Sequence, residues 1–452
     1  MKKILSLKRK YFICAAALLL VSGAAFFFLK TCLPSSENKE FESYIEDIFQ
    51  QEMKTNTLNL HYTLAYPEDY GIDEYQVTLG TMEPDALEKN QKEAEKLQRE
   101  LEKFDLSQLS EENQIIYDIL SLEFSSQLSL GSSYLLQEPL GPNLGIQAQL
   151  PILLAEYTFR TSSDIKDYFS LLADIPEYFQ SILEFEEKKA EEGLFMSDVS
   201  ADRIIQQCQS FMETGTENYL YSMFNQRVEE LLNSRRISRH QADSFIEMHD
   251  KLMGQFVFPA YLSLSQGLEE LKGRGKNTGG LAYLDGGKDY YKYLVQSTVG
   301  DYRSLDEILQ SLLLQLQEDY SKVQELLTEN PAIISSAYSL PSSGLSPEQM
   351  LDYLQHIFTD DFPELEVKEY EVKYVPESME EFSSPAFYLT PPMDTLTPNT
   401  IYINQSSQVS QAELFTTLAH EGFPGHLYQT VYFAGQDHHP IRELLSCSGY
   451  IE

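Results

Sequence analysis

Cysteine is scarce in this sequence, and its spacing excludes the scaffolds that depend on it. The 452-residue chain has four cysteines, and one of them lies in an apolar N-terminal stretch. The other three are far apart and match no cysteine-based metal motif. We therefore expect no disulfide framework, and the stability must come from a buried core. The four residues are Cys14, Cys32, Cys208 and Cys447.

Basic residues are also few. The chain has 33 lysines and arginines against 70 acidic residues, and five of the basic ones fall within the first ten positions. A phosphate backbone would be repelled by such a protein, so nucleic-acid binding is disfavoured. The hydrophobic content of 42% is ample for a large core at this length. One large domain or two smaller ones are expected.

The N-terminus carries a single long apolar stretch, Tyr11 to Leu29, between basic residues. Its length and its basic flank predict a single-pass membrane anchor at residues 1–32, with the first ten residues in the cytoplasm. A cleaved signal peptide and a lipid-modified Cys32 are the alternatives. All three place the rest of the chain outside the cytoplasm, at the cell membrane if the anchor is retained.

Helical periodicity dominates from the anchor to about residue 330, which predicts a mainly α fold. Glu83 to Phe104 has one apolar face, and Ser304 to Gln317 begins with a capping box formed by Ser304 and Glu307. We expect both apolar faces to be buried in the core. A glycine-rich loop then leads into a run of tyrosines, of which Tyr291 is a candidate substrate contact.

The hydrophobic pattern changes from helical periodicity to alternation after a serine-rich segment, residues 335–346. This segment is the best candidate for a domain boundary. We therefore divide the exported chain into a helical region, residues 33–345, and a region with strands, residues 346–452. Alternation in residues 366–375 and short apolar runs at Ala386–Leu389 and Ile401–Ile403 predict a small β element. This β element comes just before the most informative motif.

That motif is His420-Glu421-Gly422-Phe423-Pro424-Gly425-His426, at the end of a helix that a capping box starts at Ser410. Two imidazoles can hold a zinc ion, while an adjacent carboxylate takes a proton from the attacking water. In HExxH zincins the glutamate beside the first histidine is that base. The pattern therefore predicts that His420 and His426 are zinc ligands and that Glu421 is the general base.

The two histidines are six residues apart and not four. On a regular helix a six-residue step points about 120° away from the first side chain. Pro424 breaks the helical hydrogen-bond ladder, and Gly425 tolerates unusual backbone angles. We expect this Pro-Gly corner to turn the chain and to return His426 to the metal.

A third ligand is needed, and Glu452 lies about one helix-turn-helix after His426. Two histidines and a carboxylate would complete a catalytic zinc site. His438 and His439 are nearer alternatives, although Gly435 and Pro440 mark their segment as a loop. From the residues alone, these alternatives stay open.

The motif also resembles a known family. His-Glu-Gly-Phe-Pro-Gly-His-Leu-Tyr-Gln is similar to the HExxPGH signature of the bacterial domain of unknown function 885 family, whose members are regarded as zinc peptidases. The likeness extends to Leu140–Pro151, Asp285–Tyr291 and His439–Glu452. It implies a large, multi-helix, zincin-like fold, with His420 and His426 as ligands and Glu421 as the base. Glu452 matches the third ligand of the thimet-oligopeptidase type.

In this family the third ligand is the first residue of a motif usually read Glu-Gly-Trp-Ala, and the chain continues well past it, whereas this chain stops at Glu452 and has no tryptophan. The resemblance therefore predicts a C-terminal truncation, either as a fragment or as a shortened gene product that is inactive. Donors that stabilise the tetrahedral intermediate are then expected in the missing part. Tyr450 and Arg442 are the nearest candidates.

The main hypothesis is zinc-dependent hydrolysis of peptide bonds in short peptides or envelope peptides, with Glu421 activating the water. Hydrolysis of a non-peptide amide or ester by the same site is an alternative within enzymes. The alternative from another class is an inactive, membrane-tethered binding protein that retains the peptidase fold. Zinc content and a peptide-library digest separate these hypotheses.

Overall fold

The structure is a computed structural model that describes residues 36–452, except residues 144, 277–278, 339–343, 359–360, 366–369, 376–379, 381–383, 407–409, 437 and 446–447. Outside the described residues lie the predicted membrane anchor, residues 339–343 of the predicted domain boundary, and residues 366–369 of the alternating segment. Within the described part, every helix is too short or too polar to cross a membrane.

The chain is mainly helical, as predicted, and it has one small sheet. The α-helices of the first part are α2 (Ser36–Met53), α3 (Thr57–Thr63), α4 (Leu87–Leu101), α5 (Glu111–Leu130), α6 (Ile146–Glu156), α7 (Ser162–Glu192), α8 (Asp198–Glu213), α9 (Tyr219–Asn233), α10 (Arg239–Leu252), α11 (Phe258–Leu271) and α12 (Gly287–Leu294). Those of the second part are α13 (Leu305–Glu329), α14 (Ile333–Tyr338), α15 (Pro347–Ile357), α16 (Gln411–Glu421), α17 (His426–Ala434), α18 (Ile441–Leu444) and α19 (Ser448–Ile451). The strands are β1 (Tyr370–Tyr374), β2 (Ala386–Leu389) and β3 (Asn399–Ile403).

Short helical turns connect these elements. The 3₁₀ turns are η1 (Pro67–Tyr70), η2 (Leu106–Gln108), η3 (Gly131–Leu136), η4 (Gly215–Glu217) and η6 (Leu281–Tyr283). Two turns are π-helical, η5 (Met253–Val257) and η7 (Val295–Val299).

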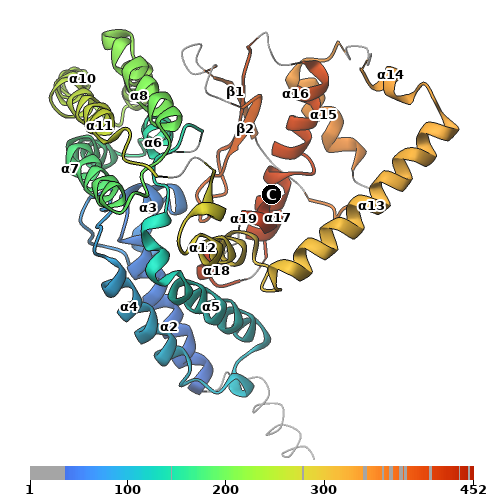
Figure 1. The fold of residues 1–452 in the computed structure, drawn as a ribbon. Helices are drawn as coiled ribbons and strands as arrows, with labels where there is room; N and C mark the ends of the chain where they lie inside the picture. The colour runs from blue at the N-terminus through green and yellow to red at the C-terminus, as the bar shows by residue number, and fades with distance from the viewer. Residues whose placement is uncertain are drawn as a thin grey trace, which may run out of the picture.

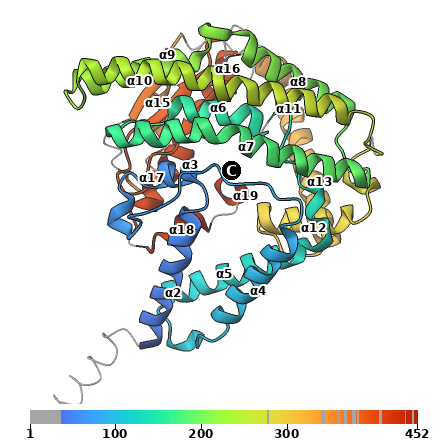
Figure 2. The same ribbon diagram turned by 90° about the vertical axis from the view of Figure 1, so that its left-hand side faces the viewer.

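Helices α2 to α11 form one side of the molecule, and the sheet with α15 to α17 forms the other (Figure 1). The long helix α7 starts at a capping box between Thr161 and Asp164 and ends at Gly193, which has φ 78°. Its buried apolar face joins the largest core cluster, together with residues of α8, α9 and α11. A second cluster lies between α2 and α5, and it includes Leu101 of α4. Figure 2 shows α2, α4 and α5 below the layer that α7 to α11 form. Most of the buried core of the described residues therefore lies in this helical side.

The prediction that the apolar face of α13 is core is wrong. The helix begins as expected, at the capping box of Ser304 and Glu307, but it has no buried residue. Seven large apolar residues along one stripe are each 49% to 66% exposed. These residues are Leu309, Leu312, Leu313, Leu316, Tyr320, Val323 and Leu326. Figure 1 shows α13 running along the outer side of the molecule. The sequence pattern correctly predicts an apolar stripe, but it does not identify what packs against it.

The sheet has the strand order β1-β3-β2, with β1 parallel and β2 antiparallel to β3. All five residues of β3 are buried because the strand is covered on both faces. Ile401 and Ile403 pack with α15 and α16, whereas Tyr402 and Phe387 pack towards α6 and α9. The sheet thus connects the helical side to the motif helix α16.

The last part of the chain folds back onto the first helix. Ile441 of α18 is buried in the same cluster as Phe41 and Ile45 of α2. Contacts between α19 and η7 also join the regions that the sequence divides at residue 345. The chain between α17 and the C-terminus therefore lies against the helical side of the molecule.

Candidate metal centre

Helix α16 carries the first part of the motif. Ser410 accepts a hydrogen bond from the backbone of Glu413, whose side chain returns to the Ser410 N–H, so the predicted capping box is present. Leu418 is fully buried against the sheet and α15. Because the helix ends at Glu421, His420 and Glu421 occupy its last turn. Their position is therefore set by the packing of α16.

The chain leaves the helix in a tight corner, Gly422 to Gly425, and α17 then begins at His426. The Gly425 N–H donates to the Ala419 carbonyl over 3.0 Å, which folds the corner back against α16. A Cβ at Gly425 would collide with the carbonyl oxygen of His420, so no residue larger than glycine fits there without a backbone shift. Phe423 anchors the corner from inside, because it is fully buried and its ring stacks on Phe358.

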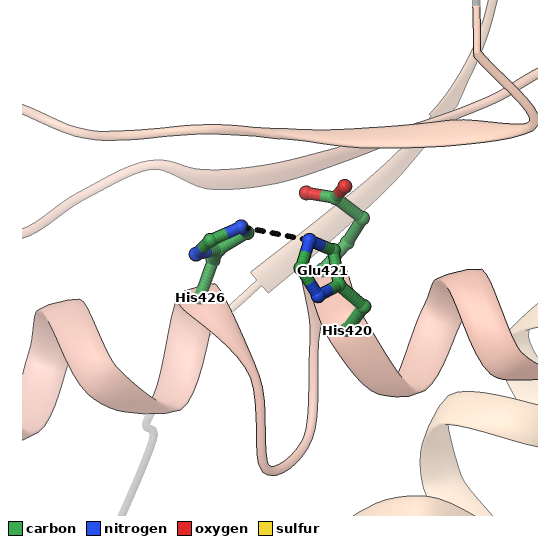
Figure 3. Close-up of side chains that lie close together, drawn as sticks. All are labelled: His420, Glu421 and His426. Atoms are coloured by element: carbon green, nitrogen blue, oxygen red, sulfur yellow. Dashed lines mark hydrogen bonds between the residues drawn. The ribbon is translucent and has the colours of Figure 1, made fainter. Parts of the chain in front are cut away.

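The corner brings the two imidazole rings together. Their Nε2 atoms are 3.1 Å apart, and the ring planes lie at 73° to one another. Figure 3 shows the rings facing each other across the corner, with the Glu421 carboxylate nearby. The Glu452 carboxylate reaches the same point from the C-terminus, with Oε2 3.3 Å from Nε2 of His420 and 3.6 Å from Nε2 of His426. Three donor atoms therefore converge from three different turns of the chain.

These three donors fit a zinc ion. Donors bound to tetrahedral zinc at about 2.0–2.1 Å are separated by about 3.3–3.4 Å. The observed separations of 3.1, 3.3 and 3.6 Å lie around that value. Two imidazoles and one carboxylate are also a donor set that catalytic zinc sites use.

Glu421 is the fourth functional group of this cluster. One of its carboxylate oxygens lies within 4.8 Å of a ring nitrogen of each histidine. Its Oε2 accepts a hydrogen bond of 2.9 Å from the backbone N–H of Tyr388 in strand β2. Burial raises the pKa of the Glu421 carboxyl above its ordinary value, while this hydrogen bond and the two imidazoles oppose the rise. A carboxylate held in this way is suited to accept a proton.

The two alternative ligands lie elsewhere. Nε2 of His438 is 3.0 Å from Glu443, and Nε2 of His439 is 3.4 Å from Glu46 of α2. Nδ1 of His439 accepts a hydrogen bond from the Ile441 N–H. These contacts connect the loop after α17 to α18 and α2. The structure thus places Glu452, and neither of these histidines, beside the pair His420 and His426.

The three predicted substrate contacts have surroundings of different kinds. Tyr291 is 51% exposed and Tyr450 is 72% exposed. The Arg442 guanidinium lies over the Phe433 ring, 5.5 Å from its centroid. Among the described residues, no hydrogen bond or ion pair joins these three side chains to the imidazoles. Their roles in substrate binding stay predictions.

Sequence reasoning missed the groups that orient the cluster. The Tyr388 N–H is a backbone group, so its side chain gives no sign of its contact with Glu421. Gln429 donates to the Tyr450 carbonyl over 3.3 Å and so joins α17 to the turn that carries Glu452. Two features of the sequence point towards these contacts. The apolar run of β2 indicates a strand near the site, and Gln429 lies one helical turn after His426.

Comparison with known proteins gives the same family that the motif resembles. A family model described as "Bacterial protein of unknown function (DUF885)" matches residues 67–452. No curated protein sequence matches the chain. Among solved structures, the crystal structure of the "putative lipoprotein from Colwellia psychrerythraea" has the same fold, with a TM-score of 0.77 and 16% identity over 92% of this chain and 76% of that chain. Because the family match covers most of the sequence, the chain belongs to the bacterial DUF885 family.

Proposed function

We propose that this protein is a zinc-dependent peptidase that hydrolyses peptide bonds in short peptides or envelope peptides. The observation that carries the proposal is the convergence of His420, His426 and Glu452 on one point, with the Glu421 carboxylate beside it. A zincin-like fold is part of the same proposal. This part of the proposal is supported by α16, which ends in His420-Glu421 and packs against the small sheet.

Each residue has a distinct task in this proposal. His420, His426 and Glu452 hold the metal through two nitrogens and one oxygen. A zinc ion bound there would supply a Lewis acid that lowers the pKa of a water to about 7. Glu421 takes the proton from the attacking water and delivers it to the leaving amine. The Tyr388 N–H holds the Glu421 carboxylate in place, so the base needs no reorientation before the reaction.

The proposed location is the cell membrane, with the bulk of the chain outside the cytoplasm. The apolar segment Tyr11–Leu29 and its basic flank support export. The similar structure from Colwellia psychrerythraea is described as a "putative lipoprotein", which agrees with an extracytoplasmic protein. Peptides of the envelope are therefore the nearest substrates.

The test compares zinc content and peptide hydrolysis in four full-length variants. His420→Ala and Glu452→Ala should lose zinc and activity together, because each removes a ligand. Glu421→Gln should retain zinc while turnover falls about 100-fold or more, because it removes only the base. His240→Ala is the matched control, since His240 is exposed on α10, far along the chain from the site.

Three results would contradict parts of the proposal. A zinc-free Glu421→Gln protein would make Glu421 a ligand. A zinc-replete and active Glu452→Ala protein would remove Glu452 from the site. A zinc-replete wild type that cleaves no member of a peptide library, but hydrolyses amide or ester substrates, would change the substrate class.

A further inference from the structure

The turn that carries Glu452 has almost no packing of its own. Helix α19 has only four residues, Ser448–Ile451, and all of them are exposed, as is Glu452. The Glu452 N–H donates to the Ser448 carbonyl over 2.9 Å, so the position of Glu452 follows that of the turn. No side chain of the turn is buried in the core, so the position of the carboxylate depends on a few contacts of its backbone and of Ser448. One of them is the hydrogen bond that Gln429 of α17 donates to the Tyr450 carbonyl.

The principal contact joins Gly449 to the π-helical turn η7. A Cβ at Gly449 would lie 2.9 Å from Cα of Val299 and 3.0 Å from the Thr298 carbonyl oxygen. Both are backbone atoms, which cannot rotate away as a side chain can. Gly449 does not have a positive φ, so its backbone conformation is open to other residues. Glycine is therefore required by the close approach alone.

A hydrogen bond accompanies this approach. The Ser448 hydroxyl donates to the Thr298 carbonyl over 3.4 Å. Carbonyls in the last turn of a helix lack a partner within the helix, which leaves Thr298 free to accept. The π-helical turn ends directly afterwards at Gly300, which has φ 70°. Turns of this kind are frequent at functional sites.

The turn η7 belongs to the helical side of the molecule. It continues α12, which packs against α5 and η3. His420 and His426 are instead fixed by the sheet and by α15. The positions of the three donors therefore depend on two separate parts of the fold, the sheet with α15 and the helical side. Gly449 lies where the C-terminal turn contacts the helical side.

We propose that Gly449 and the turn Val295–Val299 are positioning elements for the third metal ligand. They act through Glu452 and contact neither metal nor substrate. This inference rests on the proposed function, because it assumes that Glu452 is a ligand. It goes further by assigning the placement of Glu452 to a contact with a segment 150 residues away along the chain.

The experiment measures zinc affinity of the full chain by competition with a chelator, for Gly449→Ala, Gly254→Ala and Glu452→Ala. Gly254 is the matched control, because it also lacks a positive φ and a Cβ there would meet nothing within 4 Å. Gly449→Ala should weaken zinc binding by about 10- to 100-fold, as loss of supporting contacts does. Gly254→Ala should bind zinc like the wild type.

A second readout separates positioning from a general loss of structure. Cobalt(II) in place of zinc reports coordination geometry through its visible absorption spectrum. The spectrum of Gly449→Ala should resemble that of Glu452→Ala, while the thermal unfolding of both metal-free variants stays like that of the wild type. Unfolding should be unaffected because the displaced turn is exposed.

The outcomes distinguish the two proposals. If Glu452→Ala loses zinc and Gly449→Ala retains full affinity and the wild-type cobalt spectrum, the positioning role is wrong and the proposed zinc site stands. If Glu452→Ala keeps full affinity, Glu452 is not a ligand and the positioning role fails with it. A metal-free Gly449→Ala protein that unfolds at a clearly lower temperature would make the contact structural.

Discussion

The corner that holds the two histidines and the turn that holds Glu452 are built in opposite ways. Phe423 in the corner and Leu427 at the start of α17 are fully buried, and the backbone of the corner folds back on α16. In the turn, Tyr450 is 72% exposed and Ile451 is 43% exposed. Core packing fixes two donors, whereas a few backbone contacts place the third. A metal centre can therefore combine ligands held rigidly by the core with a ligand that is easily displaced.

The largest effect is expected from Phe423→Ala. Removing a fully buried aromatic side chain from the cluster around the sheet should lower the free energy of unfolding by about 3–5 kcal/mol. Denaturant unfolding of the metal-free protein measures this effect, with the Gly254→Ala protein as the control. A loss below about 1 kcal/mol would mean that the corner is not anchored by its core, and the contrast with the turn would disappear.

Gly425→Ala tests the backbone of the corner. The new methyl group collides with the His420 carbonyl, so the corner must open and separate His426 from His420. Zinc affinity should fall by about 100-fold or more, because a primary ligand is displaced. Chelator competition gives the affinity, and circular dichroism should show that the helices persist. Wild-type affinity would mean either that the corner tolerates the shift or that His426 is not a ligand.

Metal removal should affect the two regions differently. The Gly425 N–H bonds to Ala419 over 3.0 Å within packed structure, and the Glu452 N–H bonds to Ser448 over 2.9 Å within an exposed turn. Hydrogen exchange should therefore be slow at Gly425 with or without metal. At Glu452 it should be fast without zinc and about 100-fold slower at a zinc concentration of 100 times Kd. Equal exchange rates at Glu452 with and without zinc would contradict metal binding by this turn.

The smallest effect is expected from Tyr450→Ala. Because this side chain is largely exposed, its loss should change the free energy of unfolding by no more than about 0.5 kcal/mol. The same unfolding measurement as for Phe423→Ala gives the comparison directly. A loss comparable to that of Phe423→Ala would show that the turn is packed after all. A fall in kcat without a change in stability would instead support the predicted contact of Tyr450 with substrate.

Local features of the site could be predicted from the sequence. The capping box at Ser410 starts α16 as expected, and the strands Ala386–Leu389 and Asn399–Ile403 lie where apolar runs predicted them. The return of His426 towards His420 also followed from the chemistry of proline and glycine. Each of these features depends on residues within a few positions of one another. A local sequence pattern can therefore predict them.

Long-range features could not be predicted in this way. The contact of Ser448 and Gly449 with Thr298 joins segments 150 residues apart. The choice of Glu452 over His438 and His439 depends on how the loop after α17 packs against α2. The exposure of α13 depends on whether any other element covers its stripe. A periodic pattern gives the face of a helix, but the partner of that face is a property of the whole fold.

The stripe on α13 has a practical consequence for handling the protein. Its seven apolar residues are each 49% to 66% exposed and follow one stripe, and exposed apolar patches on soluble proteins are sites of association. Purified protein should therefore bind hydrophobic dyes in its folded state and adsorb to apolar resins. Loss from solution should increase with protein concentration and with sulfate, which strengthens apolar association. Replacing Leu312 and Leu316 by glutamine should improve recovery without affecting the site.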